Sequence, residues 1–102
     1  MKKAAHSGKF FVYILKCQNG AYYTGYTSDL EKRIKEHNNS KRGAKSLRGK
    51  GPVKAVWVKK YKYLHYAMSA EYRIKQLNRR QKALLIEGRR LDKVLGKRNG
   101  ER

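Results

Sequence analysis

Two polar side chains, Arg33 and His37, fall on the side of a predicted helix where the pattern favours apolar residues. Leu30 and Ile34 define the buried side of this helix when successive residues are placed about 100° apart. Arg33 and His37 then lie within about 60° of Leu30, one helical turn from each other. Their polar heads can therefore reach a common point beside the core.

Glu71 occupies a similar position in a later predicted helix. The apolar stripe of that helix is formed by Ala67, Ala70, Ile74 and Leu77. Glu71 lies about 40° from Ala67, within this stripe, and no other acidic residue occurs between positions 36 and 87. Because desolvation of a carboxylate costs several kcal/mol, such a group is rarely left without a partner. We expect it to face either a buried arginine or a metal ion.

These side chains allow two interpretations. In one, Arg33 and Glu71 form a structural ion pair at the edge of the core. In the other, they serve phosphoryl transfer, which needs a cationic clamp for the phosphorane charge, an oxygen ligand for Mg²⁺ and a base for the attacking water. Arg33 would be the clamp and Glu71 the ligand. Either His37 or a tyrosine would be the base.

The charge of the chain favours a nucleic-acid partner. The 102 residues contain 27 Lys and Arg against 7 Asp and Glu, a formal net charge of +20. Such an excess repels itself unless a polyanion neutralises it, and nucleic-acid phosphates are the commonest such polyanion. A membrane surface is disfavoured, because the basic residues are spread along the chain rather than gathered in one amphipathic helix.

Other features indicate a cytoplasmic location. The longest apolar run, Phe10 to Leu15, is far shorter than a membrane span, and no apolar segment of signal-peptide length follows the basic start. The single cysteine, Cys17, excludes an intramolecular disulfide and a cysteine-rich zinc site. We expect no small-molecule cofactor, and the sequence does not specify an oligomeric state.

The elements that must position these residues follow the order ββαβαα. Two strands, 10–15 and 21–26, flank an Asn19-Gly20 turn signal, and a third strand runs from residue 53 to about 61. This order indicates an α+β fold, in which helices cover a small sheet with antiparallel pairs.

Capping signals mark where the helices begin. The first helix is expected to begin after Ser28, with Glu31 completing a capping box, and to end near residue 39. The second covers about 66–77. The third covers about 79–87 and is capped by Asn78 and Gln81.

The chain is predicted to divide into a flexible arm (1–8), one folded domain (9–87) and a charged tail (88–102) that frays. Within the domain, residues 40–52 form a basic loop rich in glycine. Its cationic side chains are the best candidates for contacts with phosphate: Lys41, Arg42, Lys45, Arg48 and Lys50.

The order and spacing of these residues resemble the GIY-YIG nucleases. Val12-Tyr13 is followed ten residues on by Tyr23-Thr24-Gly25, and ten further by Arg33 with His37 after it; Glu71 on a later helix completes the set. From about residue 10 to residue 86 the chain is similar to the small single-domain bacterial members of this family. The shared stretches are Val-Tyr-Ile-Leu, Tyr-Thr-Gly, Asp29 to Arg33, Glu36-His37-Asn38 and Gly43-Ala44-Lys45 with Arg48-Gly49.

The resemblance implies a three-stranded antiparallel sheet flanked by helices, and hydrolysis of a DNA phosphodiester with one divalent metal ion, Mg²⁺ or Mn²⁺. Glu71 would bind the metal, and Arg33 would steady the scissile phosphate. Tyr13 and Tyr23 would activate or orient the attacking water, and His37 would assist as base or orienter. The base is left open among these three, because a tyrosine with its ordinary pKa near 10 is a poor base at neutral pH. Arg33 or the metal would have to lower that pKa.

A shared site also constrains the hairpin. A two-residue Asn19-Gly20 loop would place Tyr13 and Tyr23 on opposite faces of the sheet. A three-residue loop, 18–20, with Gly20 in the left-handed conformation places both on one face. We predict the three-residue loop.

Metal-dependent DNA endonuclease activity is therefore the leading hypothesis, and the sequence leaves open whether RNA is also cut. DNA repair or recombination is the role that the family suggests. The main alternative is a non-catalytic nucleic-acid-binding module, such as an RNA- or ribosome-associated protein, which has no use for Glu71 beside Arg33. A third interpretation is a structural or adaptor domain that has lost activity. Retention of all five site residues argues against it.

Overall fold

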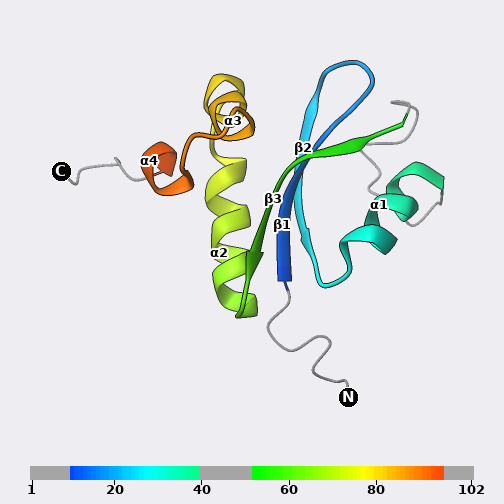
Figure 1. The fold of residues 1–102 in the computed structure, drawn as a ribbon, viewed down its shortest axis with the longest axis horizontal. Coiled ribbons are helices and arrows are strands. Elements are labelled where there is room, and N and C mark those ends of the chain that lie inside the picture. The colour runs from blue at the N-terminus through cyan, green and yellow to red at the C-terminus, as the bar shows by residue number, and fades with distance from the viewer. Residues whose placement is uncertain (1–9, 40–51, 96–102) are drawn as a thin grey trace.

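The computed structural model describes residues 10–39 and 52–95. A three-stranded antiparallel sheet has β1 at its centre, in the order β2-β1-β3 (Figure 1). The elements in chain order are β1 (Phe10–Lys16), β2 (Tyr22–Thr27), α1 (Leu30–Asn39), β3 (Lys54–Tyr61), α2 (Leu64–Lys75), α3 (Arg79–Ile86) and α4 (Leu91–Leu95). The α+β fold predicted from the sequence is confirmed.

The sheet divides the hydrophobic core into two layers, because alternate residues of β1 point to opposite faces. Val12 and Ile14 pack with Ala67, Ile74 and other residues of α2 and α3 on one side. Tyr13 and Leu15 pack on the other side with Cys17, Val53 and partly buried residues of α1. Figure 1 shows this arrangement, with α1 alone on one side of the sheet and α2, α3 and α4 on the other.

The hairpin between β1 and β2 has the predicted three-residue loop. The Cys17 amide donates to the Ala21 carbonyl at 2.8 Å, and Gly20 has a φ of 91°. In the resulting register, Tyr23 of β2 pairs with Leu15 of β1. Because Leu15 and Tyr13 are two residues apart in one strand, Tyr13 and Tyr23 lie on the same face.

The predicted start of the first helix was one residue too early. Asp29, and not Ser28, caps α1, because its Oδ1 accepts from the Lys32 amide at 3.1 Å. The Thr27 hydroxyl accepts from the Asp29 amide at 3.1 Å and fixes the turn into the helix. With Asp29 as the cap, Glu31 stands one position before the one a capping box requires.

The third helix, α3, has the capping box that the sequence predicts. The Asn78 side chain accepts from the Gln81 amide at 2.8 Å, and the Gln81 side chain accepts from the Asn78 amide at 3.0 Å. At the other end, Gly88 has a φ of 110°. The amides of Gly88 and Arg89 donate to Leu85 and Leu84, the pattern of a Schellman cap.

The expected fraying tail contains a helix. After Gly88 the chain turns back and forms α4, whose Leu91 and Val94 pack against the α2-side core. In the sequence these two apolar residues stand among charged ones, and the pattern is too short to predict a helix. The predicted arm, residues 1–8, and residues 96–102 lie outside the described part of the chain. Over residues 10–39 and 52–95, no helix has the length and apolar character needed to cross a bilayer.

Gly25 lies directly opposite Tyr13 in the hairpin. A Cβ atom added to Gly25 would meet the Tyr13 hydroxyl oxygen at 2.6 Å and the ring carbon that bears it at 2.8 Å. Both separations are shorter than any stable contact, so the ring lies where it does only because position 25 has no side chain.

We therefore expect Gly25→Ala to lower the free energy of unfolding by about 1–3 kcal/mol, the usual cost of overpacking a core. Urea denaturation measures it. In a Tyr13→Leu background, which removes the ring, the same substitution should cost much less. An equal cost in both backgrounds would show that the ring and Gly25 do not meet as described.

Candidate active site

Tyr13, Tyr23 and His37 form one cluster on the α1 side of the sheet. The Tyr13 hydroxyl lies 3.1 Å from His37 Nε2, and the two side chains are hydrogen bonded. The Tyr23 ring meets the His37 ring edge to face, with ring centroids 5.3 Å apart. Tyr13 is 1% exposed and His37 is 8% exposed, so the hydrogen bond is made inside the core.

The orientation of α1 brings His37 to this point. Leu30 and Ile34 pack against Tyr13 and its neighbours, as the helical pattern predicts. At the end of the helix, the Asn38 side chain accepts from the Val53 amide at 2.7 Å and donates to the Val53 carbonyl at 3.2 Å. This pair of bonds ties α1 to the start of β3 and fixes the face that it presents to the sheet.

Arg33 lies one turn before His37 and interacts with the same hydroxyl group. Its Nη1 forms an ion pair with Glu36 Oε1 at 2.8 Å. It also forms a hydrogen bond with the Tyr13 hydroxyl. The Arg33 side chain is 30% exposed, so an oxyanion in solvent can approach the guanidinium.

Glu36 is the residue that sequence reasoning missed. No role in the site was predicted for it, but its side chain is only 19% exposed and forms an ion pair with Arg33. The signal was present in the sequence, because side chains three residues apart on a helix are neighbours.

Glu71 approaches the cluster from α2, which packs against β1 and β2. Its side chain is 18% exposed, and its Oε2 lies 3.3 Å from Lys75 Nζ. Its negative charge makes a small contribution to raising the pKa of Tyr13, after the larger effects of burial and of Tyr23. Among the described residues, the structural ion pair suggested between Arg33 and Glu71 is replaced by two others, Arg33–Glu36 and Lys75–Glu71.

Burial sets the protonation of the cluster. It raises the pKa of Tyr13 to about 12, with a further contribution from Tyr23, while Arg33 acts in the opposite direction. Burial also lowers the pKa of His37, assisted by the positive charge of Arg33 and opposed by Glu36. At neutral pH, Tyr13 is therefore protonated and His37 is neutral. Arg33 does favour the tyrosinate, as expected, but burial outweighs it.

This protonation state discriminates among the candidate bases. At neutral pH, a tyrosine with a pKa of about 12 is in its deprotonated, basic form even less often than an isolated tyrosine. A neutral imidazole can accept a proton, and Nε2 of His37 already contacts the Tyr13 hydroxyl. The geometry favours His37 as the group that receives the proton.

Glu71 is the residue in this cluster that could hold a metal ion. Over the described ranges, no three His, Cys, Asp or Glu side chains gather as a ready-made metal site. Mg²⁺ does not need one, because it usually keeps several waters and binds through one or two carboxylates. The ammonium group of Lys75 already lies beside this carboxylate, and its side chain is 49% exposed, so it can leave for solvent.

The structure does not describe the predicted basic loop, except for its last residue, Pro52. Its five predicted phosphate-binding residues, Lys41, Arg42, Lys45, Arg48 and Lys50, lie outside the described residues. Their role stays a prediction from the sequence.

Comparison with known proteins gives one family. Residues 9–83 match the family model described as the GIY-YIG catalytic domain. UPF0213 protein CPE1444 of Clostridium perfringens is 52% identical over 79 residues, which cover 78% of this chain and 84% of that protein. UPF0213 protein YazA of Bacillus subtilis is 42% identical over 83 residues, 81% of this chain and 83% of that protein.

Two solution NMR structures are similar to the fold. The UPF0213 protein BH0048 of Bacillus halodurans shares 44% identity, with a TM-score of 0.51 over 78% of this chain and 83% of that one. The protein EF2693 of E. faecalis shares 37% identity, with a TM-score of 0.56 over the same shares.

Proposed function

The chain belongs to the GIY-YIG catalytic domain family, and we propose that it is a nuclease that hydrolyses phosphodiester bonds of DNA with one divalent metal ion, Mg²⁺ or Mn²⁺. The observation that carries this proposal is that His37 and Arg33 meet at one hydroxyl group, on which the charge of Glu71 also acts. Tyr13 is hydrogen bonded to His37 and Arg33, and it lies within the electrostatic influence of Glu71.

Arg33 supplies the charge that a phosphoryl transfer needs. A guanidinium group carries five N–H donors in a fixed plane and binds phosphate oxygens with two bonds at once. Glu36 holds one edge of it at 2.8 Å. The group is thereby pre-organised for the extra negative charge of the pentavalent phosphorane, where a fixed donor contributes most.

Tyr13 and His37 take the proton of the attacking water. As the water oxygen bonds to phosphorus, its proton passes to the Tyr13 oxygen while the Tyr13 proton moves to His37 Nε2, 3.1 Å away. The ester P–O bond on the opposite side breaks, and the departing oxygen takes a proton from solvent. Tyr23 packs against the imidazole and keeps its ring in place.

Glu71 is the proposed metal ligand, because a lone carboxylate near the reacting groups fits a hydrated Mg²⁺ or Mn²⁺. When bound, such an ion would neutralise charge on the phosphate. Lys75 would then release the carboxylate, and its half-exposed side chain can do so at little cost.

DNA is proposed as the substrate because of the net charge of +20 and the family. More specifically, we propose that the substrate is a branched intermediate of DNA repair or recombination in the cytoplasm. The alternative function is that of a non-catalytic nucleic-acid-binding module.

We predict that the protein nicks supercoiled plasmid or cuts branched oligonucleotides with Mg²⁺ or Mn²⁺, and that EDTA stops the reaction. Glu71→Gln keeps the size of the side chain but removes its charge, so it should slow cleavage at least about a hundredfold. DNA binding, measured by fluorescence anisotropy in EDTA, should be unchanged.

Glu31→Gln is the matched control, because it removes the same charge from an exposed glutamate of α1. It should cut like the wild type. If the protein binds DNA in a salt-sensitive way but cuts nothing, or Glu71→Gln cuts equally well, the binding module replaces the nuclease as the function.

The pH dependence of cleavage should report His37. Only neutral His37 accepts a proton, and its pKa lies below the ordinary 6.5. The value of kcat/KM reflects the titrating groups of the free enzyme. It should therefore stay constant as the pH is lowered to 6.5 and decrease only below that pH. The residual activity of His37→Gln should lack this fall. A fall centred above pH 6.5 would contradict the assignment.

The free energy of unfolding provides a check that needs no cleavage. Below pH 6.5 the unfolded chain binds a proton at residue 37 before the folded chain does, so stability decreases as the pH drops from 6.5 through the lowered pKa. This decrease should be smaller in His37→Gln.

A further inference from the structure

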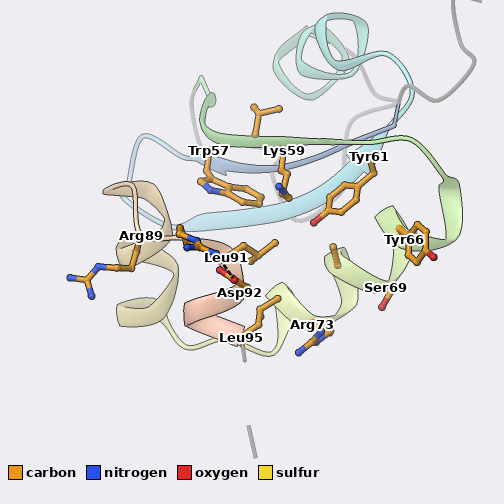
Figure 2. A pocket seen from close by; sticks show the side chains of 13 residues that line it. Trp57, Lys59, Tyr61, Tyr66, Ser69, Arg73, Arg89, Leu91, Asp92 and Leu95 are labelled. Carbon is orange, nitrogen blue, oxygen red and sulfur yellow. Dashed lines mark hydrogen bonds and ion pairs between the residues drawn. The ribbon is translucent and has the colours of Figure 1, made fainter. Parts of the chain in front are cut away.

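A groove lies on the face of the sheet opposite the tyrosine–histidine cluster. It has a volume of about 900 Å³ and lies between β3, α2 and α4. We name it the β3–α4 groove. Figure 2 shows Trp57, Lys59 and Tyr61 along β3 on one wall, with Tyr66 and Arg73 of α2 on the other side.

A bulge in β3 creates the wall of aromatic rings. The pairing of β1 with β3 shifts between Ile14 and Leu15, so that Ile14 faces Trp57 while Leu15 faces Ala55. Below the shift, Val53 packs on the α1 side of the sheet. Beyond it, Trp57, Lys59 and Tyr61 alternate onto the α2 side, about 7 Å from one to the next.

The groove combines aromatic and cationic side chains. The Lys59 ammonium lies 5.7 Å from the centre of the Tyr61 ring. Burial raises the pKa of Tyr61, and the positive charge of Arg73 partly opposes this increase. At the open end of the groove, Tyr66 is 56% exposed, a large fraction for an aromatic side chain.

The charge of the groove is strongly positive. Four cationic side chains line it: Lys59, Arg73, Arg89 and Arg90. The one carboxylate among the lining residues, Asp92, forms an ion pair with Arg90 at 2.8 Å. The occupant that complements this lining is an anion with flat apolar faces.

Single-stranded nucleic acid has both properties in one polymer. Its phosphates pair with Lys and Arg, and its unpaired bases stack on aromatic side chains without regard to sequence. In a duplex the bases stack on each other, so the aromatic side chains of the groove would have no exposed base to stack on. An acidic peptide would satisfy the charges but has no regular series of flat faces.

We propose that the β3–α4 groove binds a single-stranded stretch of DNA or RNA, with bases stacked on its aromatic rings and phosphates held by its lysine and arginines. The groove lies across the sheet from the tyrosine–histidine cluster, although α2 provides both Arg73 of the groove and Glu71 of the proposed cleavage site. Occupation of the groove does not depend on hydrolysis. In a nuclease it would retain an unpaired strand beside the catalytic face.

Trp57 reports on this groove directly, because the chain has one tryptophan. In EDTA, titration with a twelve-residue oligothymidylate should quench its fluorescence to saturation, and the affinity should fall as salt rises. A blunt duplex of the same length should quench it far less. The Glu71→Gln variant should bind the oligonucleotide like the wild type.

Two pairs of variants separate the groove from general charge. Tyr66→Ala and Arg73→Ala should each weaken binding at least about fivefold. Tyr72→Ala and Arg80→Ala remove an exposed tyrosine of α2 and an exposed arginine of α3 that do not line the groove, and should change the affinity less than twofold. Circular dichroism checks that all four fold.

Equal losses in both pairs, or binding that leaves Trp57 fluorescence unchanged, would overturn the proposal. Quenching by polyglutamate but not by the oligothymidylate would assign the groove to an acidic peptide instead. Because every measurement is made without metal, a failed cleavage assay would not affect the result.

Discussion

The hydrogen bond between the Tyr13 hydroxyl and His37 Nε2 is the interaction on which the proposed site depends. It is made at 3.1 Å between two side chains that are almost fully buried. A buried hydroxyl and a buried imidazole would each be costly without a partner, so each makes the position of the other favourable. The same burial keeps Tyr13 protonated and His37 neutral at physiological pH.

Several local features must agree for this bond to form. The three-residue hairpin loop sets the register that puts both tyrosines on one face. Gly25 leaves room for the Tyr13 ring, and Asn38 ties the end of α1 to β3. Each of these features therefore helps to place one of the two partners of the hydrogen bond.

Some of this could be predicted from the sequence, because the signals were local. Leu30 and Ile34 defined the buried side of α1, and so predicted that His37 faces the sheet. Asn78 and Gln81 marked the start of α3. The hairpin loop followed from requiring Tyr13 and Tyr23 to share a face.

What could not be predicted depended on tertiary packing or on competing local signals. Ser28 and Asp29 are both good caps, and the Thr27 hydroxyl decides between them by binding the Asp29 amide. The short helix α4 could not be predicted, because its apolar face is defined only by the packing of Leu91 against the core. The raised pKa of Tyr13 results from its burial in the core layer on the α1 side of the sheet, and sequence spacing does not show how strongly this burial opposes Arg33.

The two faces of the sheet divide the chemistry between them. The α1 side carries Tyr13, His37 and Arg33, and the α2–α4 side carries aromatic and cationic side chains that suit an unpaired strand. Glu71, the proposed metal ligand, comes from α2. The central strand β1 serves both, because its alternate residues build both layers of the core. Together, the two proposals give a single small domain two surfaces for nucleic acid.

The central proposal is that Glu71 holds a divalent metal ion at the site that contains Tyr13 and His37. The most direct test is to add Mn²⁺ in small amounts to ¹⁵N-labelled protein and record which NMR signals its unpaired electrons broaden. The account predicts selective broadening of the backbone amides of Tyr13, Gly25 and Glu71 and of the His37 imidazole, all of it lost in Glu71→Gln. Broadening that spares these groups, or that persists in the variant, would contradict it.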